Sequence, residues 1–539
     1  MDVGVHHLLI LPIILPLSTG AILLFCDERR SKIKSLISIA SAGLSVIIAV
    51  LLIMHVLKIA PASDVYRLGN WPSPFGIVLV LDRLSAMMLL LSSVLITATL
   101  VFSQAYWCKA GSHFQSLMQF FMVGINGAVL TGDLFNLFVF FEIMLTASYG
   151  LALHGSGQLR VRAGLHYVVV NLVASLLFLI GTALIYGIVG TLNMADLAVK
   201  IKNISPQDIV LFEVGAALLG VVFLLKAGMW PLNFWLMPTY SAAAAPVGAS
   251  FALLSKVGIY IILRLTLLWF GSESGHFSYF GHTILFYGGL VTIVFGFVGV
   301  LASQILVRLV AYSVLVSSGT LLAAIGISNA ALTAGALFYI VSSTLALGAF
   351  FLLVELVERS QDVGANVLAV TMEVYGDDEE EEEDEVGIYL PGTLAILGAC
   401  FGMCAILIIG LPPFSGFVAK FMMFMAILNY NKENILSSPV LHDWLFVFLV
   451  TMSGFAALIA MTRTGIRTFW VSLEGKVPRV QVIEFAPIAI LLALCFLITI
   501  IASPIGRYMS ETAKTLHDPQ NYIGSVLIDS SFKVMEMNE

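Results

Sequence analysis

The chain has 539 residues, of which 59% are hydrophobic and 11% are charged. A soluble domain carries about 25% charged residues, so this composition excludes a chain of soluble domains and predicts an all-α polytopic membrane protein. The net charge of -7 comes from one acidic run, residues 377–385. No basic face is left to neutralise phosphates, which excludes nucleic acid as a partner.

About 20 apolar residues are needed to cross a membrane as a helix. By this measure the sequence predicts about 14 transmembrane helices, near residues 6–25, 34–57, 79–102, 114–131, 134–153, 163–189, 209–229, 239–269, 279–301, 307–326, 331–356, 394–429, 444–463 and 484–506. Proline and glycine predict breaks in three of them: at the end of 209–229, near Pro246, and between Gly410 and Gly416.

The loops that alternate between the two sides of the membrane differ in their lysine and arginine content. One side holds thirteen of these residues and the other nine. Because cytoplasmic loops are enriched in lysine and arginine, both termini are predicted on the periplasmic or outer side. The acidic run falls in the predicted loop 357–390, and like charges at this density predict a solvated, unstructured segment.

Three lysines occupy stretches that otherwise match the bilayer interior. Lys226 and Lys256 bracket a region with three prolines, and Lys420 follows the break that begins at Gly410. A charged side chain at this depth costs roughly 2.5–3.5 kcal/mol, so it usually faces a protein interior or a water-filled path. Broken helices at membrane depth line such cavities. These residues predict a transport pathway, and a structural ion pair between two helices is the alternative.

Glu142 lies near the middle of the predicted helix 134–153, among aromatic and aliphatic residues. A lysine partner would keep such a carboxylate charged, and Lys226 is the best candidate. Separating the two would ease release of the lysine proton, so the pair is suited to switching. Asp133 precedes the same helix, where a carboxylate favours the helix N-terminus, and a capping role is predicted for it.

Hydroxyl groups are predicted to hold water between Lys256 and Lys420: Ser313, Ser317, Ser318 and Tyr339. Close packing or bonding back to their own helix is the alternative role of the serines. No cofactor fingerprint, iron–sulfur cysteine cluster or metal-ligand cluster is present, so neither a cofactor nor a metal is expected, and a redox enzyme is not. The five cysteines are interpreted as small hydrophobic residues.

Four segments resemble the D-type subunit of the Mrp-type multisubunit cation/proton antiporters, a family related to the antiporter-like membrane subunits of respiratory complex I and of membrane-bound hydrogenases. They read TGDLFNLFVFFE, LLKAGMWPLNFWL, YSAAAAPVGASFALLSKVGIYIILR and LPPFSGFVAKF. The resemblance implies fourteen helices with two inverted five-helix repeats and broken helices. Residues 1–105 would hold helices 1–3, 114–269 the first repeat, 279–463 the second repeat with the acidic loop, and 464–539 the last helix and tail.

The resemblance also implies roles for individual residues. Glu142 and Lys226 match the glutamate–lysine pair of the family, Lys256 its central lysine, and Lys420 the lysine of its second half-channel. The resemblance also implies that many relatives have a histidine where this chain has Ser342. A proton relay in this chain would therefore have no imidazole at that position. The acidic insertion at 377–385 is also unusual for the family.

We therefore expect a proton-translocating subunit of a monovalent cation/proton antiporter, located in a bacterial inner (plasma) membrane. The expected partners are the other antiporter subunits, of types A, B, C, E, F and G, together with protons, a monovalent cation and membrane lipid. A proton-pumping membrane subunit of a complex I-like or hydrogenase redox complex is one alternative. A scaffold subunit that conducts nothing is another, although a scaffold gains little from four buried charged residues.

Overall fold

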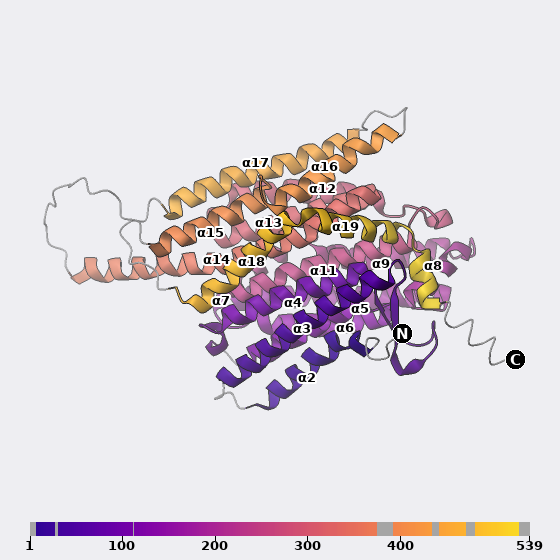
Figure 1. Ribbon diagram of the computed structural model, residues 1–539, viewed down its shortest axis with the longest axis horizontal. Coiled ribbons are helices and arrows are strands. Elements are labelled where there is room, and N and C mark those ends of the chain that lie inside the picture. The colour runs from indigo at the N-terminus through magenta and orange to yellow at the C-terminus, as the bar shows by residue number, and fades with distance from the viewer. Residues whose placement is uncertain are drawn as a thin grey trace.

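The computed structural model describes residues 7–26, 31–110, 113–374, 392–433, 441–469 and 480–527. Its helices run side by side along the long axis of the molecule (Figure 1). Within the described ranges, twelve helices are long and apolar enough to cross a membrane. Three shorter apolar helices accompany them: Leu11–Phe25, Phe114–Leu130 and Ser415–Leu428.

A helix lies in each of the fourteen predicted membrane-spanning stretches. The single-helix cases are α2 (Leu11–Phe25), α3 (Ser31–Ile59), α4 (Arg83–Ser103), α5 (Phe114–Leu130), α6 (Leu134–Ala152), α7 (Gln158–Val189), α9 (Ile209–Ala227), α12 (His282–Ala302), α13 (Leu306–Ile327), α14 (Ala330–Val374), α17 (Leu441–Phe469) and α18 (Val482–Ile500). The stretches 239–269 and 394–429 are each divided into two helices, α10 (Leu236–Ala242) with α11 (Ala245–Trp269) and α15 (Gly392–Ile409) with α16 (Ser415–Glu433).

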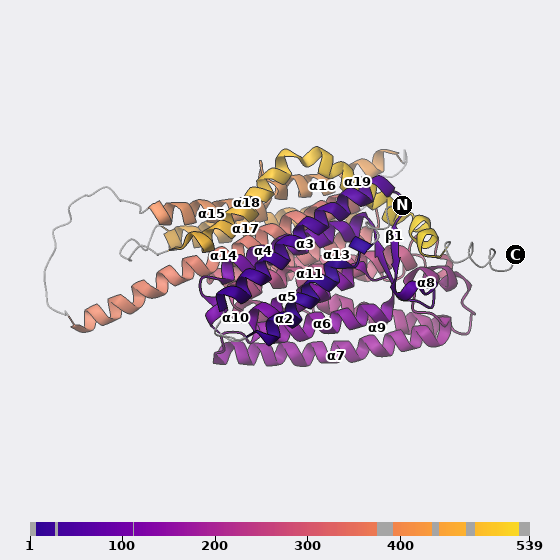
Figure 2. The same cartoon turned by 60° about the horizontal axis from the view of Figure 1, so that its bottom comes forward.

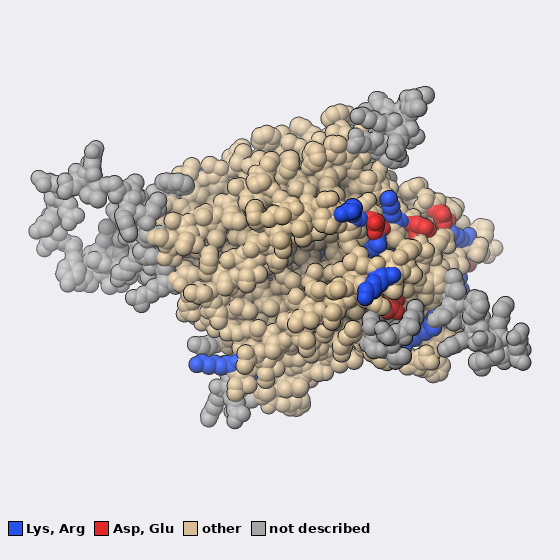
Figure 3. Space-filling model, in the orientation of Figure 1, with Lys and Arg blue, Asp and Glu red and all other residues tan. Residues whose placement is uncertain are grey.

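The surface agrees with this arrangement. On the face shown in Figure 3, most charged side chains gather toward one end of the molecule, a basic side chain lies at the opposite end, and the middle is formed by other residues. In Figure 2, α7 runs along one edge of the bundle, and α15 and α18 lie near the opposite edge. The start of α2 and the end of the helix that follows α18 lie at the same end of the bundle in Figure 1, as an even number of crossings requires.

A β-hairpin precedes α4, where the sequence predicts the start of a transmembrane helix at residue 79. β1 (Asp64–Arg67) pairs antiparallel with β2 (Val78–Leu81), with Asp64 opposite Leu81. The helix begins only after Asp82, whose side chain accepts a hydrogen bond from the Ser85 amide. Such a cap satisfies an amide that has no partner within the helix. The four residues of β2 are therefore buried as a strand, and the predicted start was wrong.

The region between Lys226 and Lys256 contains two helix ends. α9 ends at Ala227, and Gly228 follows with φ of 76°, a left-handed conformation that glycine adopts without strain. α10 is short, and α11 starts after the extended residue Ala244. Pro246 lies in the first turn of α11, where its missing amide donor is not needed. The break predicted near Pro246 is therefore confirmed: it lies between the end of α10 at Ala242 and the start of α11 at Ala245.

α11 is the centre of the bundle. All residues from Pro246 to Trp269 are buried, and the helix packs against α4, α5, α9, α13 and α14. A helix that is apolar all round is stable only inside such a shell of other helices. Lys256 therefore lies in the middle of the protein.

α14 is longer than predicted. It extends from Ala330 to Val374, whereas the predicted loop begins at residue 357. The acidic run 377–385 lies outside the described residues. The predicted break from Gly410 onward is confirmed, because α15 ends at Ile409, Gly410 has φ of 82°, and α16 begins at Ser415.

The predicted last helix, 484–506, corresponds to α18, which ends before the predicted end at residue 506. α18 ends at Ile500, and α19 (Ala502–His517) continues from it with Met509, Thr512 and Ala513 buried and Arg507, Glu511 and Lys514 exposed. This amphipathic helix was not predicted, because it has too many polar residues for a membrane-spanning helix. α8 (Met194–Lys200) was not predicted either; it is capped by Asn193.

Candidate functional site

The three lysines are buried at the interrupted helices. Lys226 lies in the last turn of α9, Lys256 in the middle of α11, and Lys420 in the second turn of α16. Their exposed fractions are 2%, 0% and 7%. Each amino group must therefore find its hydrogen-bond partners inside the protein.

The amino group of Lys226 donates to Asn171 Oδ1 at 2.5 Å. Glu142 lies on α6, half-buried, and accepts a hydrogen bond from the Ser175 hydroxyl. Asn171 and Ser175 are four residues apart on α7, so they lie on one face of that helix. Within the described part of the chain, Glu142 and Lys226 form no ion pair at 4.0 Å or less. The two residues still interact electrostatically, but the predicted direct contact is replaced by two neutral partners on α7.

The amino group of Lys256 donates to Ser317 Oγ of α13 at 2.7 Å. Ser317 in turn donates to Ser343 Oγ of α14 at 3.1 Å. Ser317 therefore lies beside Lys256, and Tyr339 lies beside Ser317 and Thr320. That these hydroxyls hold water between Lys256 and Lys420 stays a prediction. Ser313 instead donates to the Leu309 carbonyl of its own helix, and the buried hydroxyl of Ser318 has no hydrogen-bond partner among the described residues.

Ser342, the residue before Ser343 on α14, contacts the second interrupted helix pair, α15 and α16. The hydroxyls of Ser342 and Ser415 lie 2.8 Å apart, and Ser415 is the first residue of α16. Five residues later, the Lys420 amino group donates to the carbonyls of Ile409 at 2.8 Å and Ile408 at 3.3 Å. These carbonyls belong to the last turn of α15, where no helical amide is available to bond them. Lys420 therefore caps the broken end of α15.

The helices that hold the three lysines and their hydrogen-bond partners form a row in which each helix packs against the next. α7 packs on α9, α9 on α11, α11 on α13, α13 on α14, and α14 on α16. Gly258 of α11 lies directly against the main chain of Lys226 and Ala227, which brings the Lys226 and Lys256 helices close together. Within the described residues, no cluster of three or more histidine, cysteine, aspartate or glutamate side chains is arranged to hold a metal ion.

Residues 131–446 match the family described as "NADH:quinone oxidoreductase/Mrp antiporter, TM". A probable K(+)/H(+) antiporter subunit of type D from Rhizobium meliloti (strain 1021) is 57% identical over 97% of this chain and 97% of its own length. A Na(+)/H(+) antiporter subunit of the same type from Alkalihalophilus pseudofirmus is 34% identical over 97% of this chain and 99% of its own. The chain belongs to the family of D-type Mrp antiporter subunits. It is therefore a multi-pass membrane subunit of a multisubunit antiporter complex.

The fold of this antiporter subunit is shared with larger membrane complexes. A chain of the Mrp complex from Dietzia sp. DQ12-45-1b matches with a TM-score of 0.81 at 24% identity, over 97% of this chain and 100% of that one. A chain of respiratory complex I from Thermus thermophilus matches with a TM-score of 0.74 at 19% identity, over 95% and 99%. At these identities the likeness concerns the fold alone.

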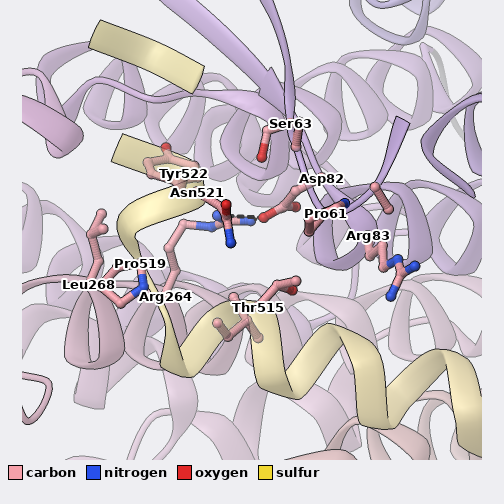
Figure 4. A pocket seen from close by; sticks show the side chains of 13 residues that line it. Pro61, Ser63, Asp82, Arg83, Arg264, Leu268, Thr515, Pro519, Asn521 and Tyr522 are labelled. Carbon is pink, nitrogen blue, oxygen red and sulfur yellow. Dashed lines mark hydrogen bonds and ion pairs between the residues drawn. The ribbon is translucent and has the colours of Figure 1, made fainter. Parts of the chain in front are cut away.

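The antiporter subunit also contains a buried ion pair that the sequence did not predict. Arg264 of α11 binds Asp82 in a two-pronged contact, with nitrogen–oxygen distances of 2.8 and 2.9 Å. Figure 4 shows the two side chains facing each other, with Tyr522 beside Arg264. Burial raises the pKa of Asp82, but Arg264 and hydrogen bonds from Ser85 outweigh burial and hold this pKa below its usual value. Arg264 lies eight residues after Lys256 in the same apolar run. A second charged residue in that run is the sequence signal from which a buried ion pair could have been predicted.

The sequence also did not predict a cluster of charged side chains around Glu355 and Arg359, farther along α14 than Ser343. Glu355 accepts from the Trp107 indole at 2.8 Å and pairs with Arg359 at 2.7 Å. Arg359 also binds Glu484 of α18, whose side chain is 3% exposed, at 2.8 Å. These contacts tie α14 to α18 and to the segment before α5. The capping role predicted for Asp133 is confirmed, because its side chain accepts from the Asn136 amide.

Proposed function

We propose that this antiporter subunit moves protons through the membrane part of a monovalent cation/proton antiporter, along an axis formed by Glu142, Lys226, Lys256 and Lys420. The observation that carries the proposal is that all three lysine amino groups are buried and donate to neutral oxygens of Asn171, Ser317 and Ile409. A lysine used only as a structural charge would gain most from a carboxylate partner. A buried lysine with neutral partners is able to change its protonation state, which arginine is not.

The serines provide the connection between the central lysine and the second broken helix. Ser343 belongs to the Lys256 group and Ser342 to the Ser415 group, and they are neighbours on α14. A hydroxyl both donates and accepts, so it passes a proton without holding a charge. In this proposal Ser342 replaces the imidazole of many relatives by a hydroxyl that turns toward α16, with water completing the path where side chains do not meet.

We propose potassium as the first cation to test. The relative named for K(+)/H(+) exchange is 57% identical to this chain, and the two relatives named for Na(+)/H(+) exchange are 34% and 31% identical. The proposed partners are the other subunits, of types A, B, C, E, F and G. Both termini are proposed on the outer side of a bacterial inner membrane, and the four domains predicted from the sequence, with two inverted repeats, remain part of this proposal.

The test uses everted membrane vesicles from an antiporter-deficient host that expresses the whole complex. A respiration-driven pH gradient is set up, and its dissipation is measured after addition of KCl, NaCl or LiCl. Wild-type complex should dissipate the gradient, and Lys256→Ala should not, with equal assembly by native gel. Wild-type exchange in Lys256→Ala vesicles would contradict the proposal. The pumping alternative predicts a gradient formed on electron transfer and no exchange on cation addition.

A further inference from the structure

Asn171 is held in one orientation at the Lys226 amino group. Its Nδ2 donates to the Tyr167 carbonyl at 2.8 Å, one turn earlier on α7. Because the amide nitrogen is occupied there, Oδ1 is the atom left to face Lys226, which donates to it at 2.5 Å. Both side chains are buried, with exposed fractions of 0% for Asn171 and 2% for Lys226. The contact is therefore buried, and its acceptor oxygen is held in place.

Ser175 holds the other member of the pair. It stands one turn after Asn171 on α7 and donates to a carboxylate oxygen of Glu142. One helix face thus offers a neutral acceptor to the lysine and a neutral donor to the glutamate. The two charged groups that attract each other electrostatically are each bound to α7 and not to one another.

We propose that Asn171 is a positioning residue that holds Lys226 away from Glu142, and that transport requires the lysine to alternate between these two partners. The inference rests on the proposed function of the Glu142–Lys226 pair. An amide oxygen accepts a hydrogen bond from a protonated or a neutral lysine, whereas a carboxylate strongly favours the protonated one. With Asn171 as partner, Lys226 is free to give up its proton, and with Glu142 as partner it takes one up.

Other titratable groups surround this switch. α6 contributes Glu142 and Tyr149, α7 contributes Tyr167, and α11 contributes Lys256, which is two residues from Gly258. Of these, Glu142 is the one carboxylic acid, and it is the one that acts electrostatically on Lys226. An aspartate introduced at position 171 would therefore place a second carboxylic acid beside Lys226.

The experiment measures the pH profile of cation-induced gradient dissipation with the whole complex in everted vesicles. Asn171→Asp gives Lys226 a carboxylate in its resting position, and Asn171→Leu leaves Glu142 as its one strong partner. In both variants the lysine holds its proton more tightly, so the profile should move to higher pH by about one unit, equivalent to a tenfold change in proton affinity. Asn171→Leu keeps the test open if Asn171→Asp does not assemble. Thr182→Val is the control, since this buried α7 hydroxyl makes no hydrogen bond in the described residues.

The outcomes separate the inference from the proposed function. If Glu142→Ala and Lys226→Ala abolish exchange and either Asn171 variant has the wild-type profile, the positioning role is overturned. A lower maximal rate with an unmoved profile also overturns it, because that result describes a structural residue. If Glu142→Ala and Lys226→Ala retain wild-type exchange, the proposed function fails and the inference fails with it.

Discussion

Gly258 of α11 lies against the main chain of Lys226. A Cβ atom at Gly258 would stand 2.9 Å from the Ala227 amide nitrogen and 3.1 Å from Lys226 Cβ. Both neighbours belong to the rigid end of α9 and have little room to move aside. The absence of a side chain at Gly258 therefore sets how closely the Lys226 and Lys256 helices approach.

Gly258→Ala should displace the end of α9 and lower exchange. Overpacking of a dense interior costs about 1–3 kcal/mol, and a small shift of Lys226 breaks its contact with Asn171. Gly220→Ala on α9 is the matched control, because a Cβ there meets nothing within 4 Å. Exchange in vesicles and the melting temperature of the purified complex are the measurements. Equal activity in the two variants would contradict the role given to this contact.

Glu142→Ala should abolish exchange while the complex still assembles. The side chain is half-buried and accepts its hydrogen bond from Ser175, so little packing depends on it. Aspartate, one methylene shorter, should restore only part of the activity because it does not reach Ser175 and Lys226 equally well. The assay is gradient dissipation with assembly followed in parallel. Wild-type exchange in Glu142→Ala would remove this residue from the axis.

Lys256→Arg and Lys420→Arg should assemble and fail to transport. Arginine keeps the positive charge but effectively never releases its proton. Histidine, which titrates near neutral pH, should recover more activity than arginine or alanine at either position. The measurement is again gradient dissipation after cation addition. Full activity in the arginine variants would reduce these lysines to fixed charges.

Ser342→Ala and Ser343→Ala should each slow exchange by about tenfold, the effect of losing one hydrogen bond worth roughly 1.4 kcal/mol along the path. Thr344→Val is the control on the same helix, since among the described residues its hydroxyl bonds only to the Ile340 carbonyl one turn earlier. Ser342→His, which places a titratable imidazole at this point, should retain activity. Equal rates in Ser343→Ala and Thr344→Val would show that no proton passes through these serines.

Asp82→Asn should lower the stability of the complex by about 3–5 kcal/mol, because Arg264 would be left buried without its partner. The pKa of Asp82 is lowered in the folded protein, so its contribution is present above the unfolded pKa of about 3.9 and is lost as pH falls through the folded value. Thermal unfolding of the purified complex as a function of pH is the measurement. A wild-type melting temperature for Asp82→Asn near pH 7 would contradict the prediction.

The sequence determined the fold class, the approximate number of spans and the positions of the three breaks. Apolar runs of about 20 residues, glycine and proline are local signals, and the resulting helices depend little on their neighbours. The break near Pro246 lies just before the proline, because a proline in the first turn of a helix lacks an amide donor that is not needed there. The strand Val78–Leu81 was missed because a short apolar run is compatible with either a strand or a helix.

The sequence also supplied Glu142, Lys226, Lys256 and Lys420, since charge in an apolar run is conspicuous. Only the tertiary structure decided what each of them binds. Asn171, Ser175 and the Ile409 carbonyl come from other helices than the residues they bind, and polar uncharged groups inside a membrane helix give no signal that distinguishes a partner from a packing residue. Partner choice is set by helix packing, because a one-residue rotation of α7 would turn Asn171 about 100° away from Lys226.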